Sequence, residues 1–327
     1  MKHMLLEARN LSKSYGGRGL RDTGNSIRAV DDVSIGLQSG TAHGMVGESG
    51  AGKSTLVRLL LALERPDRGT VRFDGIDITS VPAVRLRPLR RRFQAVFQDP
   101  YTSLNPHLKV GTIVAEPLAA HAIARGTERQ ELVRRLLEAV GLPAAAATRR
   151  PGAFSGGERQ RIAIARALAT SPDLVVLDEP LSALDLPAQV RLIELLLRLR
   201  SERSLTLLVV AHDLAVVRSL CDTVSVMYAG RMVEEGPVGQ VLVSPLHPFT
   251  AQLLAAEPMA DPYASLPRPA SGPPDGSWPP GACRLFPRCP LASDICLREP
   301  DLLETVPGRR VACWHPGQKD RATDPDR

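Results

Sequence analysis

Residues 47–54 of this 327-residue chain read Gly-Glu-Ser-Gly-Ala-Gly-Lys-Ser, and this stretch decides the fold. It fits the P-loop pattern G-x-x-x-x-G-K-[ST], whose glycines let backbone N–H groups face phosphates. It follows the apolar stretch 42–46 and precedes a segment, 53–63, that reads as a helix. This order of strand, loop and helix favours a phosphate-binding loop over an ordinary glycine-rich turn.

The P-loop carries the groups that ATP and Mg²⁺ require. We expect Lys53 to place a point charge on the β/γ-phosphates and the Ser54 hydroxyl to bind Mg²⁺. The residues of this stretch that we expect to contact the nucleotide are Gly47, Glu48, Ser49, Gly50, Ala51, Gly52, Lys53, Ser54 and Thr55.

A second motif consists of two carboxylates after an apolar strand. The strand is expected at 174–177, and Asp178 and Glu179 follow it. An acid at the end of a strand beside the P-loop strand can hold Mg²⁺ through water, which suits Asp178. Glu179 is then placed to orient and deprotonate the attacking water. The alternative is that both carboxylates merely end a strand at the surface.

A third motif, Ser155, Gly156, Gly157 and Glu158, opens an expected helix at 157–170. Free backbone N–H groups and the helix dipole would make this a second phosphate site. One nucleotide does not need two cradles in one chain. The pattern therefore favours a dimer in which this helix end covers the γ-phosphate held by a partner chain, although a simple N-cap is the alternative.

The three motifs, in this order, resemble the nucleotide-binding domain of ABC transporters, and the resemblance implies further site residues. Gln98 resembles the glutamine that reaches Mg²⁺ and the attacking water and senses the membrane partner. Asp185, in Ser-Ala-Leu-Asp at 182–185, resembles part of the loop that crosses the dimer interface. His212 resembles the switch histidine on the γ-phosphate, and Tyr15 resembles the aromatic residue that stacks on adenine. A surface tyrosine is the alternative for Tyr15.

The signature stretch departs from the family pattern at two places. Phe154 stands where the family usually has Leu, and Glu158 stands where it usually has Gln. The serine and backbone contacts survive both changes. Glu158 adds a negative charge near phosphate, which we expect to weaken dimer closure slightly.

The chain is expected to form an α/β P-loop NTPase with a helical signature subdomain and a small cysteine-bearing C-terminal module. The ATP-binding domain is predicted at 3–258 and its helical subdomain at about 99–165. Eight prolines in 258–280 indicate a linker at 259–280. The remaining segments are the module, 281–316, whose shape the main domain is not expected to fix, and a polar tail, 317–327. The expected strands are 5–11, 42–46, 95–97, 174–177, 206–211 and 224–228, and the expected helices are 53–63, 130–140, 157–170, 189–201 and 214–220.

Four of the five cysteines, Cys283, Cys289, Cys296 and Cys313, lie in the module. In a reducing compartment such clustering favours a metal over disulfides. Four thiolates can enclose Zn²⁺ or an iron–sulfur cluster, but the spacing is not that of a C-x-x-C zinc ribbon. The family resemblance implies a [4Fe–4S] cluster, and four reduced cysteines without a metal remain the alternative. Cys221 is expected in the core.

Composition and charge restrict the classes of function. The net charge of +6 is spread along the chain, so no nucleic-acid partner is expected. We see no signal peptide and no apolar run of bilayer length, which predicts a cytoplasmic protein whose membrane helices come from other chains. Three other classes are disfavoured. ABC proteins that act on ribosomes or DNA usually carry tandem domains or coiled coils, and exporters usually carry fused membrane domains. Kinases and GTPases lack the Ser-Gly-Gly helix.

Several stretches resemble those of oligopeptide/dipeptide importers in particular. They are residues 96–106, His-Pro-Phe-Thr at 247–250, and the cysteine module. This resemblance implies an ATPase subunit at the cytoplasmic face of the membrane that energises peptide import, with nickel or another small solute as the alternative cargo. It implies as partners a second ABC ATPase subunit, two transmembrane permeases and an extracytoplasmic solute-binding protein.

Overall fold

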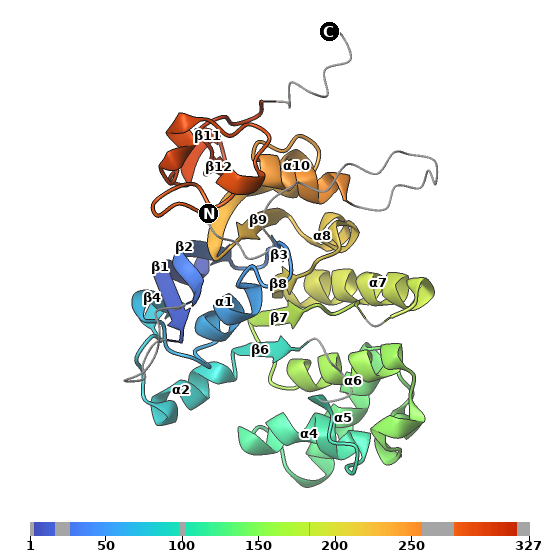
Figure 1. Cartoon of the computed structure of the whole chain (residues 1–327). Coiled ribbons are helices and arrows are strands. Elements are labelled where there is room, and N and C mark those ends of the chain that lie inside the picture. Colours follow the sequence, from blue (N-terminus) through green and yellow to red (C-terminus); the bar gives the residue numbers. More distant parts are fainter. Residues whose placement is uncertain (1–2, 17–26, 98–102, 183, 257–277, 319–327) are drawn as a thin grey trace.

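The computed structural model describes residues 3–16, 27–97, 103–182, 184–256 and 278–318, and within them the strands form two sheets (Figure 1). The larger sheet runs in the order β11-β12-β10-β9-β3-β8-β7-β6 and the smaller one in the order β2-β1-β4-β5. Strands of the larger sheet are β3 (Ala42–Val46), β6 (Phe93–Val96), β7 (Leu174–Asp178), β8 (Thr206–Val210), β9 (Thr223–Tyr228), β10 (Arg231–Pro237), β11 (Leu303–Val306) and β12 (Arg309–Val311). Strands of the smaller sheet are β1 (Met4–Tyr15), β2 (Ile27–Gln38), β4 (Arg68–Phe73) and β5 (Ile76–Asp77).

The helices are α1 (Lys53–Leu60), α2 (Ala83–Arg90), α4 (Val110–Ala120), α5 (Gly126–Ala139), α6 (Gly156–Leu168), α7 (Leu186–Arg203), α8 (Leu214–Leu220), α9 (Val238–Val241) and α10 (Pro248–Ala255). Some helices lie beside the larger sheet, among them α1, α7 and α8 (Figure 1). Helices α4, α5 and α6 form a layer below β6 in Figure 1. The expected helix 214–220 is confirmed as α8, and the other four expected helices are confirmed with shifted ends. None of the helices in the described ranges is long and apolar enough to cross a bilayer.

The parallel centre of the larger sheet is buried on both faces because its strands are continuously apolar. Strands β6, β7, β8, β3 and β9 pair in parallel. Alternate residues of each strand point to opposite faces, so Val175 and Leu177 enter one core while Leu174 and Val176 enter the other. The expected α/β architecture is therefore confirmed.

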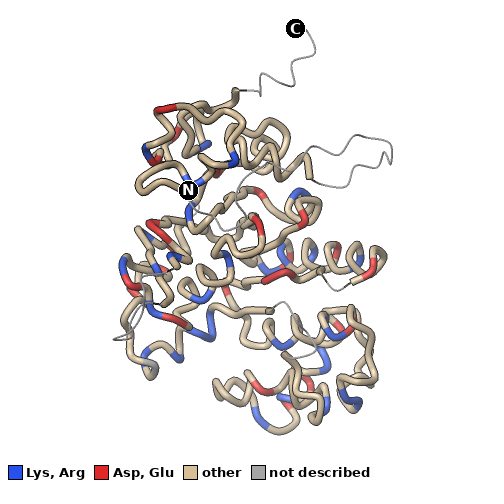
Figure 2. Tube along the Cα trace, viewed as in Figure 1, with Lys and Arg blue, Asp and Glu red and all other residues tan. Residues whose placement is uncertain are grey.

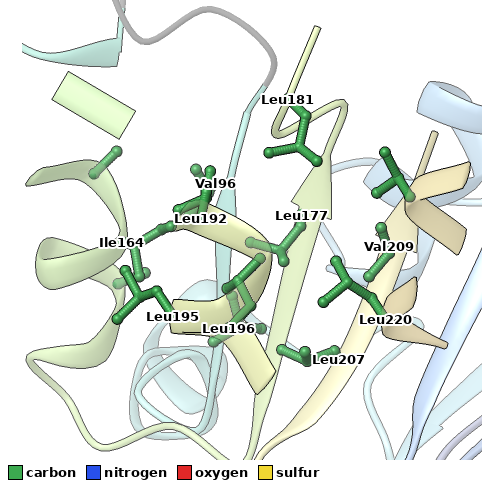
Figure 3. Packing of buried hydrophobic residues seen from close by; sticks show 14 of the residues in the cluster. Val96, Ile164, Leu177, Leu181, Leu192, Leu195, Leu196, Leu207, Val209 and Leu220 are labelled. Atoms are coloured by element: carbon green, nitrogen blue, oxygen red, sulfur yellow. The ribbon is translucent and has the colours of Figure 1, made fainter. Parts of the chain in front are cut away.

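Helices α6, α7 and α8 cover one face of that sheet. Figure 3 shows Leu192, Leu195 and Leu196 of α7 packed toward Leu177 and Leu207 of β7 and β8. The same core continues into α4 and α5, so the helical layer is attached through buried leucines, valines and alanines. The start of the predicted subdomain at 99–165 lies outside the described residues, which resume at Ser103.

The smaller sheet was not predicted, because only residues 5–11 of its strands read as a strand. It packs through Leu6, Val33 and Phe73 onto α1 and the second face of the larger sheet. Helix α1, which follows the P-loop, is consequently buried between the two sheets, and its residues Leu56 and Leu60 are almost fully enclosed.

The C-terminal module is part of the larger sheet. Strand β12 pairs antiparallel with β10 (Glu234 opposite Val311), and β11 pairs with β12. The expectation that the main domain does not fix the shape of the module is therefore wrong, because backbone hydrogen bonds join the two. The predicted linker 259–280 and tail 317–327 lie mostly outside the described residues, so both stay predictions.

A buried ion pair holds β12 in place. Glu234 is fully buried, and Arg309 donates from Nη2 to its Oε1 at 2.6 Å. Backbone N–H groups of Leu246 and His247 complete the set of donors to this carboxylate. His247 also caps α10, and burial lowers its pKa to about 3, so its ring is neutral. The His-Pro-Phe-Thr stretch thus ties α10 to β10.

Arg309→Ala is expected to destabilise the docked module by about 3–5 kcal/mol, because it leaves the Glu234 carboxylate buried without its cation. Arg310→Ala is the matched control. Arg310, the next residue of β12, pairs with Glu235 of β10, but the arginine is more than one-third exposed and Glu235 is less completely buried than Glu234, so its loss should cost clearly less than that of Arg309. Urea unfolding of the two variants measures the difference, and equal losses would contradict this account.

Candidate functional site

The P-loop follows β3 in a backbone conformation that two of its glycines make possible. Gly52 has φ +100°, and a Cβ there would lie 2.0 Å from the carbonyl oxygen of Ala29. At Gly47 a Cβ would lie 2.2 Å from the carbonyl oxygen of Met227. Side chains are excluded at both positions, so the loop backbone can approach its neighbours and turn its N–H groups outward.

Lys53 is buried at the start of α1 and points back onto the loop. Its Nζ donates to the carbonyl oxygens of Gly47 at 2.7 Å and Glu48 at 2.9 Å. Burial lowers the pKa of Lys53, while the carboxylates of Glu179, Asp178 and Glu48 oppose that change. The structure therefore brings the P-loop cation and the two carboxylates of the second motif into one electrostatic neighbourhood.

Asp178 and Glu179 lie where β7 ends, beside the ends of β8 and β3. Burial is the first cause of the raised pKa of Asp178, and the adjacent Glu179 charge adds to it. Glu179 has a left-handed backbone with φ 49°, and its N–H donates to Val210. A non-glycine residue in that conformation is uncommon and is concentrated at functional sites. The turn carries Glu179 out of the strand direction.

His212 follows β8 and lies next to Glu179. Its Nδ1 is 3.5 Å from Oε2 of Glu179, and both residues line a cavity of about 80 Å³ together with Ser182 and Gln189. The histidine side chain is largely exposed. The structure thus places the predicted base and the predicted switch histidine side by side.

The signature residues begin α6 with a capping box. Ser155 is the N-cap, its Oγ accepts from the Glu158 N–H at 3.3 Å, and Glu158 Oε2 accepts from the Ser155 N–H at 2.8 Å. Sequence reasoning treated Glu158 only as an added charge and missed this role, although S-x-x-E before an apolar helix is its signal. Gly157, next to Gly156, lets α6 approach α7, since a Cβ would lie 3.2 Å from that of Ala188.

Two further predicted residues are placed at the ends of elements. Asp185 is the N-cap of α7 and accepts from the N–H of Ala188 at 2.8 Å. Tyr15 ends β1, donates to Glu64 at 2.7 Å and also hydrogen-bonds Thr55 just after the P-loop. Tyr15 is therefore close to the start of α1, and its stacking on adenine stays a prediction. Gln98 lies outside the described residues.

These residues fit a nucleoside triphosphate with Mg²⁺. The glycine cradle and Lys53 suit the phosphates, Ser54 is exposed at the loop end, and Asp178 supplies a carboxylate for the metal. Bound Mg²⁺ would neutralise charge on the phosphate oxygens. Glu179 would accept a proton from the attacking water, and His212 would hold a hydrogen bond to the transferred phosphate.

The four module cysteines lie in one neighbourhood. The Cys283 N–H donates to the Cys296 carbonyl at 2.9 Å. Burial raises the pKa of Cys283 to about 11, and Cys289 and Cys296 add to that effect. Burial likewise raises the pKa of Cys313 to about 11, with contributions from Cys283 and Cys296.

The predicted metal centre in this module is not confirmed. Among the described residues, which include all five cysteines, no group of three or more His, Cys, Asp or Glu side chains is placed to hold a metal ion. Cys221 packs against the main hydrophobic core, as predicted.

Comparisons with known proteins agree with this geometry. Residues 30–182 match the ABC transporter family, and residues 233–296 match the C-terminal region of oligopeptide/dipeptide transporters. A probable peptide ABC transporter ATP-binding protein of Sinorhizobium fredii is 44% identical over 96% of this chain and 90% of the relative. The chain belongs to the ABC transporter ATP-binding proteins. It is therefore an ATPase, as predicted.

Other relatives and solved structures of this ABC ATPase family are similar along most of the chain. The oligopeptide transport ATP-binding protein AppF of Bacillus subtilis is 41% identical over 94% of this chain and 96% of its own length. The di/tripeptide transport ATP-binding protein DppF of Pseudomonas aeruginosa is 40% identical over 96% and 98%. The ATP-binding cassette MJ0796, solved as a dimer in a post-hydrolysis state with ADP and Pi, superposes with a TM-score of 0.63 at 30% identity, covering 71% of this chain and 98% of that one.

Glu179→Gln is expected to leave ATP binding intact and to lower hydrolysis by at least about a hundredfold, because the P-loop remains while the base is lost. Radiolabelled ATP binding and phosphate release measure the two effects on the same preparation. Lys53→Ala is the comparison and should lose binding itself. Near wild-type hydrolysis by Glu179→Gln would rule out its role as the base.

Proposed function

We propose that this ABC ATPase energises the import of peptides, and that it works as half of a nucleotide-binding dimer. The match of residues 233–296 to the C-terminal region of oligopeptide/dipeptide transporters supports peptides as the cargo, because an ATP-binding domain alone would not carry this region. The names of the relatives support the same cargo. Nickel or another small solute is the second candidate.

The division of the site supports the dimer. The P-loop, Asp178, Glu179 and His212 gather at the edge where β3, β7 and β8 end, whereas Ser155 is exposed at the start of α6 in the helical layer (Figure 1). We propose that Ser155 and its neighbours Gly156, Gly157 and Glu158 cover the phosphate held by a partner. Asp185 would lie at that interface, and Gln98 would report the state of the permease.

The proposed assembly contains a second ABC ATPase subunit, two transmembrane permeases and an extracytoplasmic solute-binding protein. This chain would lie at the cytoplasmic face of the membrane. Its basic and acidic residues are interspersed over all parts of the described fold (Figure 2), so ionic contacts with permeases would depend on individual pairs of opposite charges.

Reconstitution tests the proposal. The isolated chain is expected to hydrolyse ATP slowly, with a rate that rises with protein concentration, because each site needs a signature from another subunit. In liposomes with the cognate permeases and partner ATPase, a peptide-loaded binding protein should raise the rate further. Stimulation by nickel-loaded binding protein alone would assign the other cargo, and a fast concentration-independent rate of the isolated chain would exclude the dimer.

We also propose a [4Fe–4S] cluster on Cys283, Cys289, Cys296 and Cys313. The donor set supports it: four thiols lie in one short segment and influence one another, and a bound metal would keep them deprotonated despite their burial. No step of ATP hydrolysis depends on this group.

Anaerobically purified protein is expected to contain about four irons per chain and to absorb visible light through thiolate-to-iron transitions. Cys296→Ser should lower the iron content, and Cys221→Ser, which alters a cysteine outside the module, should not. If the protein contains neither iron nor zinc and all four thiols react with a thiol reagent, the cysteines are reduced and bind no metal. If it contains one zinc per chain, the site binds zinc and not an iron–sulfur cluster.

A further inference from the structure

The loop between the first two module cysteines contacts the ATP site. It reads Cys-Arg-Leu-Phe-Pro-Arg-Cys at 283–289, so an arginine adjoins each thiol inside the loop. Leu285, between them, is buried in the main core and fixes the loop against the sheet. Both arginines then reach residues of the ATP-binding domain that are more than fifty positions away in sequence.

Arg288 binds the second residue of the P-loop. Its Nη1 donates to Glu48 Oε2 at 3.2 Å and its Nη2 donates to Glu48 Oε1 at 3.2 Å, so the guanidinium binds the carboxylate in a bidentate manner. Arg288 also hydrogen-bonds Tyr228, the last residue of β9. Tyr228 is itself held against Phe249 with ring centroids 4.5 Å apart. A two-point contact of this kind restricts the direction of the Glu48 side chain.

Arg284 contacts the same neighbourhood. It is buried, pairs with Asp31, and donates to the carbonyl oxygen of Ala229. The next residue, Gly230, donates its N–H to Ala51 of the P-loop at 2.9 Å. The turn after β9 is consequently held between the module and the P-loop.

The contact at Glu48 bears directly on Lys53. The Glu48 carbonyl is one of the two acceptors that hold Lys53 Nζ, and Ala51 donates its N–H to the same carbonyl at 3.1 Å. Fixing the Glu48 side chain therefore restricts the peptide unit on which both the loop turn and the lysine depend. A loop already held in its binding conformation loses less conformational entropy when phosphates bind.

We infer that Arg288 is a positioning residue of the nucleotide site, through which the cysteine module holds the P-loop in its phosphate-binding conformation. This rests on the nucleotide site described above. The module thereby acts on ATP affinity without touching ATP. Its contact is partly exposed, so the expected effect is a graded one.

A double-mutant cycle on the full-length chain tests the inference. The Kd of a fluorescent ATP analogue with Mg²⁺ is measured for wild type, Arg288→Ala, Glu48→Ala and the double variant. Arg288→Ala should weaken binding by about three- to tenfold in the wild-type background and by less than about twofold once Glu48 is Ala. Arg288→Lys should restore part of the affinity. Arg298→Ala is the matched control, since Arg298 is an exposed arginine of the same module whose side chain has no ion pair among the described residues.

Steady-state kinetics of the assembled transporter separate positioning from loss of structure. Arg288→Ala should raise the KM for ATP while kcat stays within about twofold of wild type. Equal weakening in both backgrounds, or no weakening at all, would overturn the inference, as would a fall in kcat with unchanged KM. If Arg288→Ala unfolds the module, Arg288→Lys and Glu48→Ala still test whether the contact raises ATP affinity, because both variants keep a positive charge beside Cys289. A wild-type chain that binds no nucleotide would instead refute the site itself.

Discussion

The structure depends on how closely the P-loop backbone approaches two other segments, the start of β2 and the end of β9 with the turn that follows it. Carbonyl oxygens of Ala29 and Met227 lie where side chains of Gly52 and Gly47 would otherwise be, and Gly230 donates to Ala51. These contacts are made by backbone atoms, so they cannot be relieved by a change of rotamer. The end of β9, the start of β2 and the phosphate loop must therefore be assembled together, and the small sheet and the large sheet are joined at this point.

The chemistry follows from the same assembly. Because β3, β8 and β7 are parallel neighbours, their carboxyl ends meet at one edge, and the residues that follow them lie close together. Lys53, Asp178, Glu179 and His212 come from three separate strand ends but share one neighbourhood. Lys53 and Asp178 are both buried, and each lies near an opposite charge. Bound phosphates would pair with Lys53, and bound Mg²⁺ would pair with Asp178.

Much of the core and of the catalytic edge could be predicted, because their signals are local. Strand 42–46, helix 214–220 and the Asp178–Glu179 pair each depend on residues within a few positions of one another. Strand β2 could not, because Asp31 and Asp32 interrupt its apolar pattern. Asp31 is tolerated in a strand since Arg284, 253 positions later, neutralises it, and a single sequence does not show that pairing. The contact of Arg288 with Glu48 was hidden for the same reason.

The module is attached differently from the helices. Helix α7 packs through leucines, whereas the module combines one buried leucine, Leu285, with the ion pairs Glu234–Arg309, Asp31–Arg284 and Glu48–Arg288. The first two of these pairs are buried, and buried ion pairs contribute less net stability than apolar packing of equal size but require a defined geometry. A segment held in this way keeps one orientation relative to the P-loop. Any change that moves Cys283 or Cys289 must also move an arginine bonded to the ATP-binding domain, so the thiols and the phosphate loop are mechanically linked.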